Sequence, residues 1–235
     1  MRAVAKEAVV SRRLYLAVVC VFLVAYPILM PEPTADMDIL FVAINVTVAA
    51  LLVLWAVKLA GLSPSEVGLS RDTLGRSLLL GTLVGLIAPA IAFGLFHWPV
   101  FRQQDWWAEL GMTFPTLLYR LAIRIPLGTA AFEEVAFRGV VFGLFLREGT
   151  GKTIWLSSAL FGIYHIGLIV RVFDSSNIVL MQMPFAAMVV AGVVVTAIWG
   201  LIFALVRHKS GNVAGPIVTH WMAYASANVL AFIFG

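Results

Sequence analysis

Two adjacent glutamates, Glu133 and Glu134, and two histidines, His165 and His220, stand in the middle of long apolar runs of this sequence. In a membrane, an ionisable side chain costs at least about 2.5–3.5 kcal/mol on insertion scales, so each of these residues needs a reason to be there. A carboxylate beside two imidazoles can activate a water molecule, or can hold a metal ion that does so. The four residues are therefore candidates for a catalytic site.

One arginine, Arg138, lies in the same run as the glutamates. At about 100° per residue, Arg138 falls about 40° round a helix from Glu134 and about 140° from Glu133. We therefore expect Arg138 to pair with Glu134, which leaves the Glu133 carboxylate free to accept and release protons.

The same residues lie at comparable depth on three separate runs. Glu133 is 14 residues before Arg147, and His165 is 13 residues after Lys152, so both lie roughly 20 Å along their helices from the same basic side. His220 is somewhat nearer that side but within reach. The spacing therefore predicts that the four side chains converge on one buried polar site.

The amino-acid composition indicates whether this site lies in a soluble or a membrane protein. Of 235 residues, 62% are hydrophobic and only 12% are charged, whereas a soluble domain has roughly 45–50% apolar and roughly 25% charged residues. This excludes an ordinary water-soluble globule. The 16 Lys and Arg residues outnumber the 12 Asp and Glu residues, as is usual where cytoplasmic loops are basic. The sequence has no basic cluster with interleaved aromatic residues, so we expect no nucleic-acid partner. The single cysteine, Cys20, excludes an intrachain disulfide.

Seven apolar runs are candidates to cross a bilayer. They are 14–30, 39–60, 77–98, 114–146, 154–170, 184–206 and 213–234. We predict an all-α polytopic membrane protein, one domain over residues 1–235, whose seven transmembrane helices enclose the polar site. The fourth run would be about 50 Å long as a helix, against a hydrocarbon core of about 30 Å. We therefore expect an interfacial helix over 114–125 and a kink near Pro126; if both parts cross, the spans number eight.

Basic residues fix the expected orientation. Sorted into alternating loops, eleven fall on the side of the N-terminus and two on the other, while the remaining three lie in the fourth run. This asymmetry predicts seven spans and a cytoplasmic N-terminus. We expect an integral protein of a bacterial plasma membrane.

Smaller features predict local contacts. The order Ser63-Pro64-Ser65-Glu66 is typical of a capped helix start, so a short interfacial helix is expected within 61–76. The spacings Gly81-x-x-x-Gly85 and Gly139-x-x-x-Gly143 favour close helix packing, and Asn45 and Thr196 favour interhelical hydrogen bonds.

The polar motifs resemble those of the CPBP family of intramembrane proteases, which includes the type II CAAX prenyl endopeptidases and the bacterial Abi proteins. The first motif, EExxxR followed by Gly, is matched by Glu133, Glu134, Arg138 and Gly139. The second motif, FxxxH, is matched by Phe161 and His165, and the third, a later intramembrane histidine, by His220. The resemblance covers about 61–228, and the motifs lie within 114–234.

The resemblance implies an endopeptidase in which Glu133 activates the attacking water with His165 as its partner. His220 then contributes either to an oxyanion site or to metal ligation. A metal-dependent mechanism would use Glu133, His165 and His220 as ligands of a divalent ion such as zinc. A metal-free mechanism fits the same residues, and the lack of HExxH leaves both open. The implied substrates are membrane-tethered or lipidated peptides and proteins within the lipid bilayer.

The last motif departs from the family pattern, which usually has Asn or Asp one turn after the histidine. Position 224 is Tyr, and Asn228 lies about 80° round the helix from His220. We expect the Tyr224 hydroxyl to donate to a developing oxyanion instead.

Two functions of other classes fit the same residues. A non-proteolytic member of the family would act as an immunity, scaffold or regulatory protein. A proton-coupled transporter would use Glu133 and His165 as a relay, but no inverted repeat is visible in the sequence, which counts against it.

Overall fold

The computed structural model describes residues 2–30, 38–97, 113–175 and 184–234, which are helical with short connections and without strands in these ranges. The helices before the site are α1 (Arg2–Leu29), α2 (Asp38–Lys58), η2 (Arg71–Thr73), α3 (Leu74–Gly85) and α4 (Ile87–His97). The central segment comprises α7 (Phe114–Tyr119), η3 (Arg120–Ala131), α8 (Phe132–Glu134), η4 (Val135–Val141), α9 (Phe142–Phe145) and η5 (Leu146–Glu148). The last helices are α10 (Thr150–Tyr164), α11 (Ile166–Ser175), α12 (Phe185–Ser210) and α13 (Ala214–Phe234).

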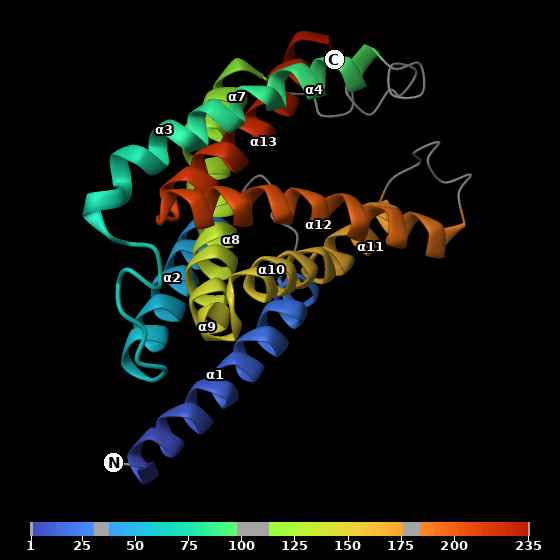
Figure 1. Ribbon diagram of the computed structural model, residues 1–235. Coiled ribbons are helices and arrows are strands. Elements are labelled where there is room, and N and C mark those ends of the chain that lie inside the picture. Colours follow the sequence, from blue (N-terminus) through green and yellow to red (C-terminus); the bar gives the residue numbers. More distant parts are fainter. Residues whose placement is uncertain (1, 31–37, 98–112, 176–183, 235) are drawn as a thin grey trace.

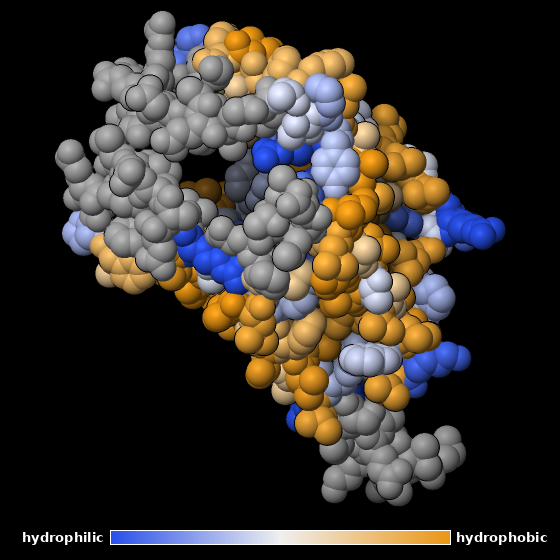
Figure 2. All heavy atoms as spheres, turned by 180° about the vertical axis from the view of Figure 1, so that it is seen from behind, coloured by the Kyte–Doolittle hydropathy of each residue, from blue (hydrophilic) through white to orange (hydrophobic). Residues whose placement is uncertain are grey.

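The predicted class of fold, an all-α polytopic membrane protein, is confirmed. Within the described ranges, six helical stretches are long and apolar enough to cross a membrane, and the fourth run supplies the interrupted helix between them. Large apolar side chains such as Leu29, Val21 and Trp155 are more than half exposed. Figure 2 shows apolar residues over much of one outer face, as a surface in contact with lipid requires. Figure 1 shows the two chain ends on opposite sides of the molecule.

The fourth run forms one helical rod through the middle of the molecule. Helical segments follow one another from Phe114 to Glu148, and Figure 1 shows α7, α8 and α9 one below another. Pro126 lies within η3, whose turns are widened to the π type. A widened turn accommodates a residue without an N–H, so the helix continues through Pro126 without a break. The glutamates therefore lie on a continuous support.

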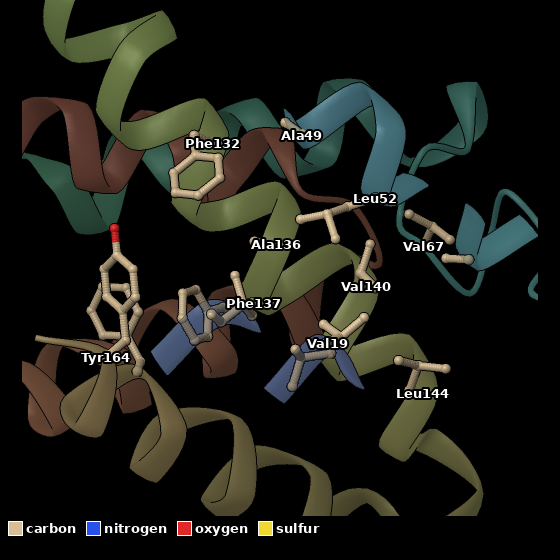
Figure 3. Close-up of a cluster of buried hydrophobic side chains, with 14 of the residues drawn as sticks. Val19, Ala49, Leu52, Val67, Phe132, Ala136, Phe137, Val140, Leu144 and Tyr164 are labelled. Carbon is tan, nitrogen blue, oxygen red and sulfur yellow. The ribbon is translucent and has the colours of Figure 1, made fainter. Parts of the chain in front are cut away.

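Apolar packing fixes the rotation of this rod. Phe132, Ala136, Phe137 and Val140 are at most 1% exposed, and Figure 3 shows them among side chains from other segments. The edge of the Phe137 ring meets the Phe161 ring of α10, with centroids 5.1 Å apart. Rotation of the rod would expose these side chains, so burial of the apolar face holds the glutamates in place.

The structure has a single turn where a short helix was expected within 61–76. The backbone N–H of Ser63 donates to Glu66 Oε2 at 2.8 Å, and the N–H of Glu66 donates to Ser63 Oγ at 3.2 Å, which is a capping box. Only one turn follows, because Gly68 takes a φ of +80°. A short 3-10 helix, η2, begins at Arg71.

The Glu66 carboxyl has a pKa below its ordinary value of 4.5. Partial burial acts to raise this pKa, but hydrogen bonds from the backbone and side chain of Ser63 and the charges of Arg12 and Arg147 lower it more. A lowered folded-state pKa contributes stability that is present above the unfolded value and is lost as the pH falls through the folded value. We expect wild type to have a higher melting temperature than Glu66→Gln at about pH 6, and the difference to shrink as the pH falls below 4.5. A difference that is constant with pH would contradict this assignment.

The small-residue spacing on α3 lets it contact α13 closely. A Cβ atom on Gly81 would lie 2.3 Å from the backbone oxygen of Gly215, and one on Gly85 would lie 2.5 Å from the sulfur of Met222. Gly143 of the other spacing packs in the same way, because its Cβ would lie 2.9 Å from the Glu66 backbone oxygen. The close packing of helices predicted for the first spacing is confirmed, whereas the second spacing packs against the turn at 62–67.

Enlarging Gly81 is expected to unfold the contact between α3 and α13. Gly81→Val forces two backbones apart and should destabilise the protein by about 3 kcal/mol or more. Gly75 lies on the same helix with open space around it, so Gly75→Ala is the control and should stabilise slightly. Thermal unfolding in detergent measures both; equal melting temperatures for the two variants would show that the close approach is unimportant.

Candidate active site

The structure brings the predicted polar residues together. Glu133 and Glu134 end α8, Arg138 follows one turn later in η4, His165 caps the C-terminus of α10, and His220 lies in α13. All five are at most 6% exposed. Three helical segments that are distant in the chain therefore form one buried site, as the depth of these residues predicted.

Glu134 links the arginine to the second histidine. Its Oε2 lies 3.3 Å from Arg138 Nε, and its Oε1 accepts from Arg138 Nη1 at 3.3 Å, so the predicted pair is present. Arg138 Nη2 also donates to the Gly200 carbonyl at 2.9 Å. His220 Nδ1 lies 2.8 Å from Glu134 Oε1. Because a carboxylate only accepts, Nδ1 carries a proton and the Nε2 atom of His220 faces Glu133.

His165 is oriented by its own helix. Its Nδ1 donates to the Phe161 carbonyl at 2.7 Å, so Nε2 again points to Glu133. Glu133 Oε2 lies 3.9 Å from Nε2 of His165 and 3.9 Å from Nε2 of His220. These separations are too long for direct hydrogen bonds and suit a bridging water. Glu133 Oε2 is buried and has no hydrogen-bond partner among the described residues.

Aromatic rings enclose the charged groups. The Arg138 guanidinium lies 4.2 Å from the centre of the Phe161 ring, and the His220 ring stacks on Phe203 with centroids 4.8 Å apart. Tyr164 is also buried, and its side chain interacts with Glu133. Neither Phe203 nor Tyr164 was predicted from the sequence as a site residue. For Tyr164 the signal was its place beside His165, whereas nothing distinguishes Phe203 from the other phenylalanines.

Tyr224 lies between the site and a cavity. Its ring centroid is 5.1 Å from that of His220, and it lines a cavity of about 800 Å³ that Asn228 also lines. Tyr224 is 42% exposed. The residue that replaces the family's Asn or Asp therefore contacts the histidine, while Asn228 bonds away from it, to Arg120 Nη1 at 3.4 Å.

Polar bonds from α1 and α2 support the rod just before the glutamates. Asn45 Nδ2 donates to the Gly128 carbonyl at 2.6 Å, and Asn45 Oδ1 accepts from the Tyr26 hydroxyl. The interhelical bond predicted for Asn45 is confirmed. The prediction for Thr196 was wrong, because its hydroxyl donates to Gly192 one turn back on the same helix at 2.8 Å.

The described residues form no preassembled zinc centre. In the part of the chain that the structure describes, no three His, Cys, Asp or Glu side chains are arranged to bind a metal ion. Glu133 Oε2 lies 3.9 Å from each imidazole Nε2, whereas ligands around tetrahedral zinc are about 3.3 Å apart. The geometry gives no support to Glu133, His165 and His220 as a metal site. The chemistry that it supports is that of a carboxylate and two imidazoles.

These observations define an α-helical integral membrane protein with a buried glutamate–histidine site. Residues 115–226 match the family described as type II CAAX prenyl endopeptidase, Rce1-like. The match covers all three motifs, and it bears out the resemblance of this part of the chain to the CPBP family. No curated protein and no solved structure matches the chain.

Proposed function

We propose that the protein is an intramembrane endopeptidase that hydrolyses membrane-tethered peptides or proteins with water activated by Glu133 and His165. The observation that carries this proposal is the buried Glu133 Oε2, which lacks a direct partner and faces two imidazole Nε2 atoms at 3.9 Å. A buried carboxylate oxygen is costly without a hydrogen bond. A water molecule between these groups satisfies it and is held for attack.

The reaction follows from the places of the donors and acceptors. Glu133 takes a proton from the water molecule while the oxygen of that water attacks the carbon of the peptide carbonyl. His165 holds the water in line for the attack. His220, when doubly protonated, and Tyr224 donate hydrogen bonds to the carbonyl oxygen as it becomes negative. The carbon–nitrogen bond then breaks, and Glu133 returns its proton to the leaving amine. Glu134 and Arg138 hold His220 in position.

The depth of the site selects the substrate. The site residues are almost fully buried. A segment already anchored in the bilayer reaches such a site more readily than a soluble protein does. We propose a plasma membrane location with a cytoplasmic N-terminus, and the distribution of basic residues supports this orientation.

A site-dependent cleavage assay tests the proposal. Purified wild type and Glu133→Ala are incubated in proteoliposomes with a library of lipid-anchored peptides, and products are identified by mass spectrometry. We expect cleavage by wild type and none by the variant. Tyr224 breaks the family pattern, so the competing function is a non-proteolytic scaffold or immunity protein. Wild type that cleaves no peptide, together with a cellular phenotype unaffected by Glu133→Ala, would support that function and contradict ours.

A further inference from the structure

One tryptophan of α13 donates a hydrogen bond to the backbone of the rod, shortly before Pro126. Trp221 is half-buried, and its Nε1 donates to the Leu121 carbonyl at 2.8 Å. Figure 1 shows α13 beside the α7–α8 part of the rod, and α13 contacts η3 there. An indole N–H can only donate, so the bond joins the two helices through a main-chain acceptor of the rod.

The acceptor is the carbonyl that Pro126 leaves without a donor. In a π turn, the N–H of a residue bonds to the carbonyl five residues earlier, and Leu121 is five residues before Pro126 within the widened helix η3. Proline has no N–H, so it cannot make this bond. Within a bilayer, a backbone group that proline frees needs a partner from a neighbouring residue or helix. Trp221 supplies that partner.

The residue before Trp221 makes a second bond from α13 to the rod. His220 Nδ1 donates to Glu134 Oε1 at 2.8 Å. Two adjacent residues of α13 therefore bond to the rod at Leu121 and at Glu134, which are 13 residues apart, and the widened segment lies between these two points. Both bonds can form together only if that segment keeps one length and one twist.

The widened turns determine the direction in which the glutamates point. A π turn closes on the fifth residue and an α turn on the fourth, so a π turn holds one more residue. One residue corresponds to about 100° around a helix. Loss of one widened turn would therefore rotate Glu133 and Glu134 by about this angle with respect to Leu121, and Glu134 would turn away from His220.

We propose that Trp221 is a positioning residue for the reaction. Its indole N–H takes the place of the N–H that Pro126 lacks, and it thereby holds the rod in the turn at which His220 meets the glutamates. Asn45 of α2 bonds to the same segment at the Gly128 carbonyl, so donors from two neighbouring helices hold the widened turns. The inference rests on the proposed function, because the positioning acts on Glu133 and His220.

A double-mutant cycle tests whether the indole N–H replaces that of residue 126. Trp221→Phe removes the N–H but keeps an aromatic ring, and Pro126→Ala returns an N–H to the turn. Trp221→Phe should lower the melting temperature in detergent by about 2–4 °C. In a Pro126→Ala background, the same change should lower it by less than about half as much. Equal losses in the two backgrounds would show that the ring acts by packing alone and would overturn the proposal.

Kinetics separate positioning from stability. At a temperature where all variants are folded, Trp221→Phe should lower kcat for an anchored peptide by about tenfold and change KM by less than about twofold. Adding Pro126→Ala should restore most of the lost kcat. Trp155→Phe, at an exposed position of α10, is the matched control and should change neither constant. A wild-type kcat in Trp221→Phe would limit the bond to stability and overturn the positioning role.

The nitrogen-15 spectrum of histidine-labelled protein reports on His220 without any activity. The Nδ1 signal of His220, assigned with His220→Gln, should shift in Trp221→Phe and return when Pro126→Ala is added. The Nδ1 signal of His165, which bonds within its own helix, should move less. A His220 signal that does not respond to Trp221→Phe would overturn the proposal. A response in a protein whose wild type cleaves nothing would contradict the protease activity but support the placement of His220 by Trp221.

Discussion

Replacing Glu133 with glutamine is expected to lower kcat for a cleaved membrane-tethered peptide by a factor of about 10²–10⁴. Glutamine has the shape of glutamate but cannot take a proton from water. Glu133 Oε2 makes no direct hydrogen bond in the described structure, so the variant should fold as wild type does. KM should change little, because the variant alters none of the other side chains around the site. Initial rates over a range of peptide concentrations in proteoliposomes separate the two constants.

A matched glutamate controls for the change of charge. Glu148 lies in η5 and is exposed, so Glu148→Gln should keep kcat within about twofold of wild type. If Glu133→Gln kept more than about a tenth of the wild-type kcat, Glu133 would not be the base. The elution volume and melting temperature of each variant show whether it is folded.

Replacing Arg138 with methionine is expected to destabilise the protein by about 3–5 kcal/mol, because it leaves the Glu134 carboxylate buried without its cation. Arg138 is fully buried, pairs with Glu134 at 3.3 Å and donates to the Gly200 carbonyl at 2.9 Å. The change also removes the stacking of the guanidinium on Phe161. The melting temperature in detergent measures the loss, and activity should fall with it because Glu134 also orients His220.

The double variant Glu134→Gln/Arg138→Met distinguishes the contribution of the Arg138 charge to stability from the contribution of its packing. Removal of both charges relieves the unpaired carboxylate, so the double variant should be more stable than Arg138→Met alone. A double variant that is less stable than the single variant would show that Arg138 acts through its packing on Phe161 and Gly200, and that its charge matters little.

The pairing of Glu134 with Arg138 could be predicted because it depends on one helix only. Residues four apart share a face of a helix, and the widened turns of η4 do not separate them. Convergence of Glu133 with the two histidines was also predictable, since counting residues from the basic loops gives similar depths. Both inferences use distances along a helix, which the sequence contains directly.

Contacts between helices were harder to predict from the sequence. The bond from His220 to Glu134 and the stacking of His220 on Phe203 depend on the rotation of α13 against the rod, which packing such as that of Gly81 on Gly215 determines. The contact of Arg120 with Asn228 could not be predicted for the same reason. The absence of a break at Pro126 depends on a widened turn, and no residue pattern in the sequence signals such a turn.

Tyr224 shows what a motif alone leaves unspecified. Its place one turn after His220 marks it as a departure from the family, and the structure adds that its ring contacts the histidine and lines the cavity. A phenol at this position keeps a hydrogen-bond donor next to His220. The departure is therefore compatible with hydrolysis.

Cleavage in water enriched in oxygen-18 tests Glu133-dependent hydrolysis most directly. Wild type and Glu133→Gln are incubated with the same lipid-anchored peptide, and the products are weighed by mass spectrometry. We predict that wild type yields a fragment whose new carboxyl end carries one oxygen-18 atom and that Glu133→Gln yields no such fragment in the same time. Equal amounts of labelled fragment from the two proteins would contradict the role of Glu133, and a wild-type protein that yields none from any anchored peptide would contradict the protease itself.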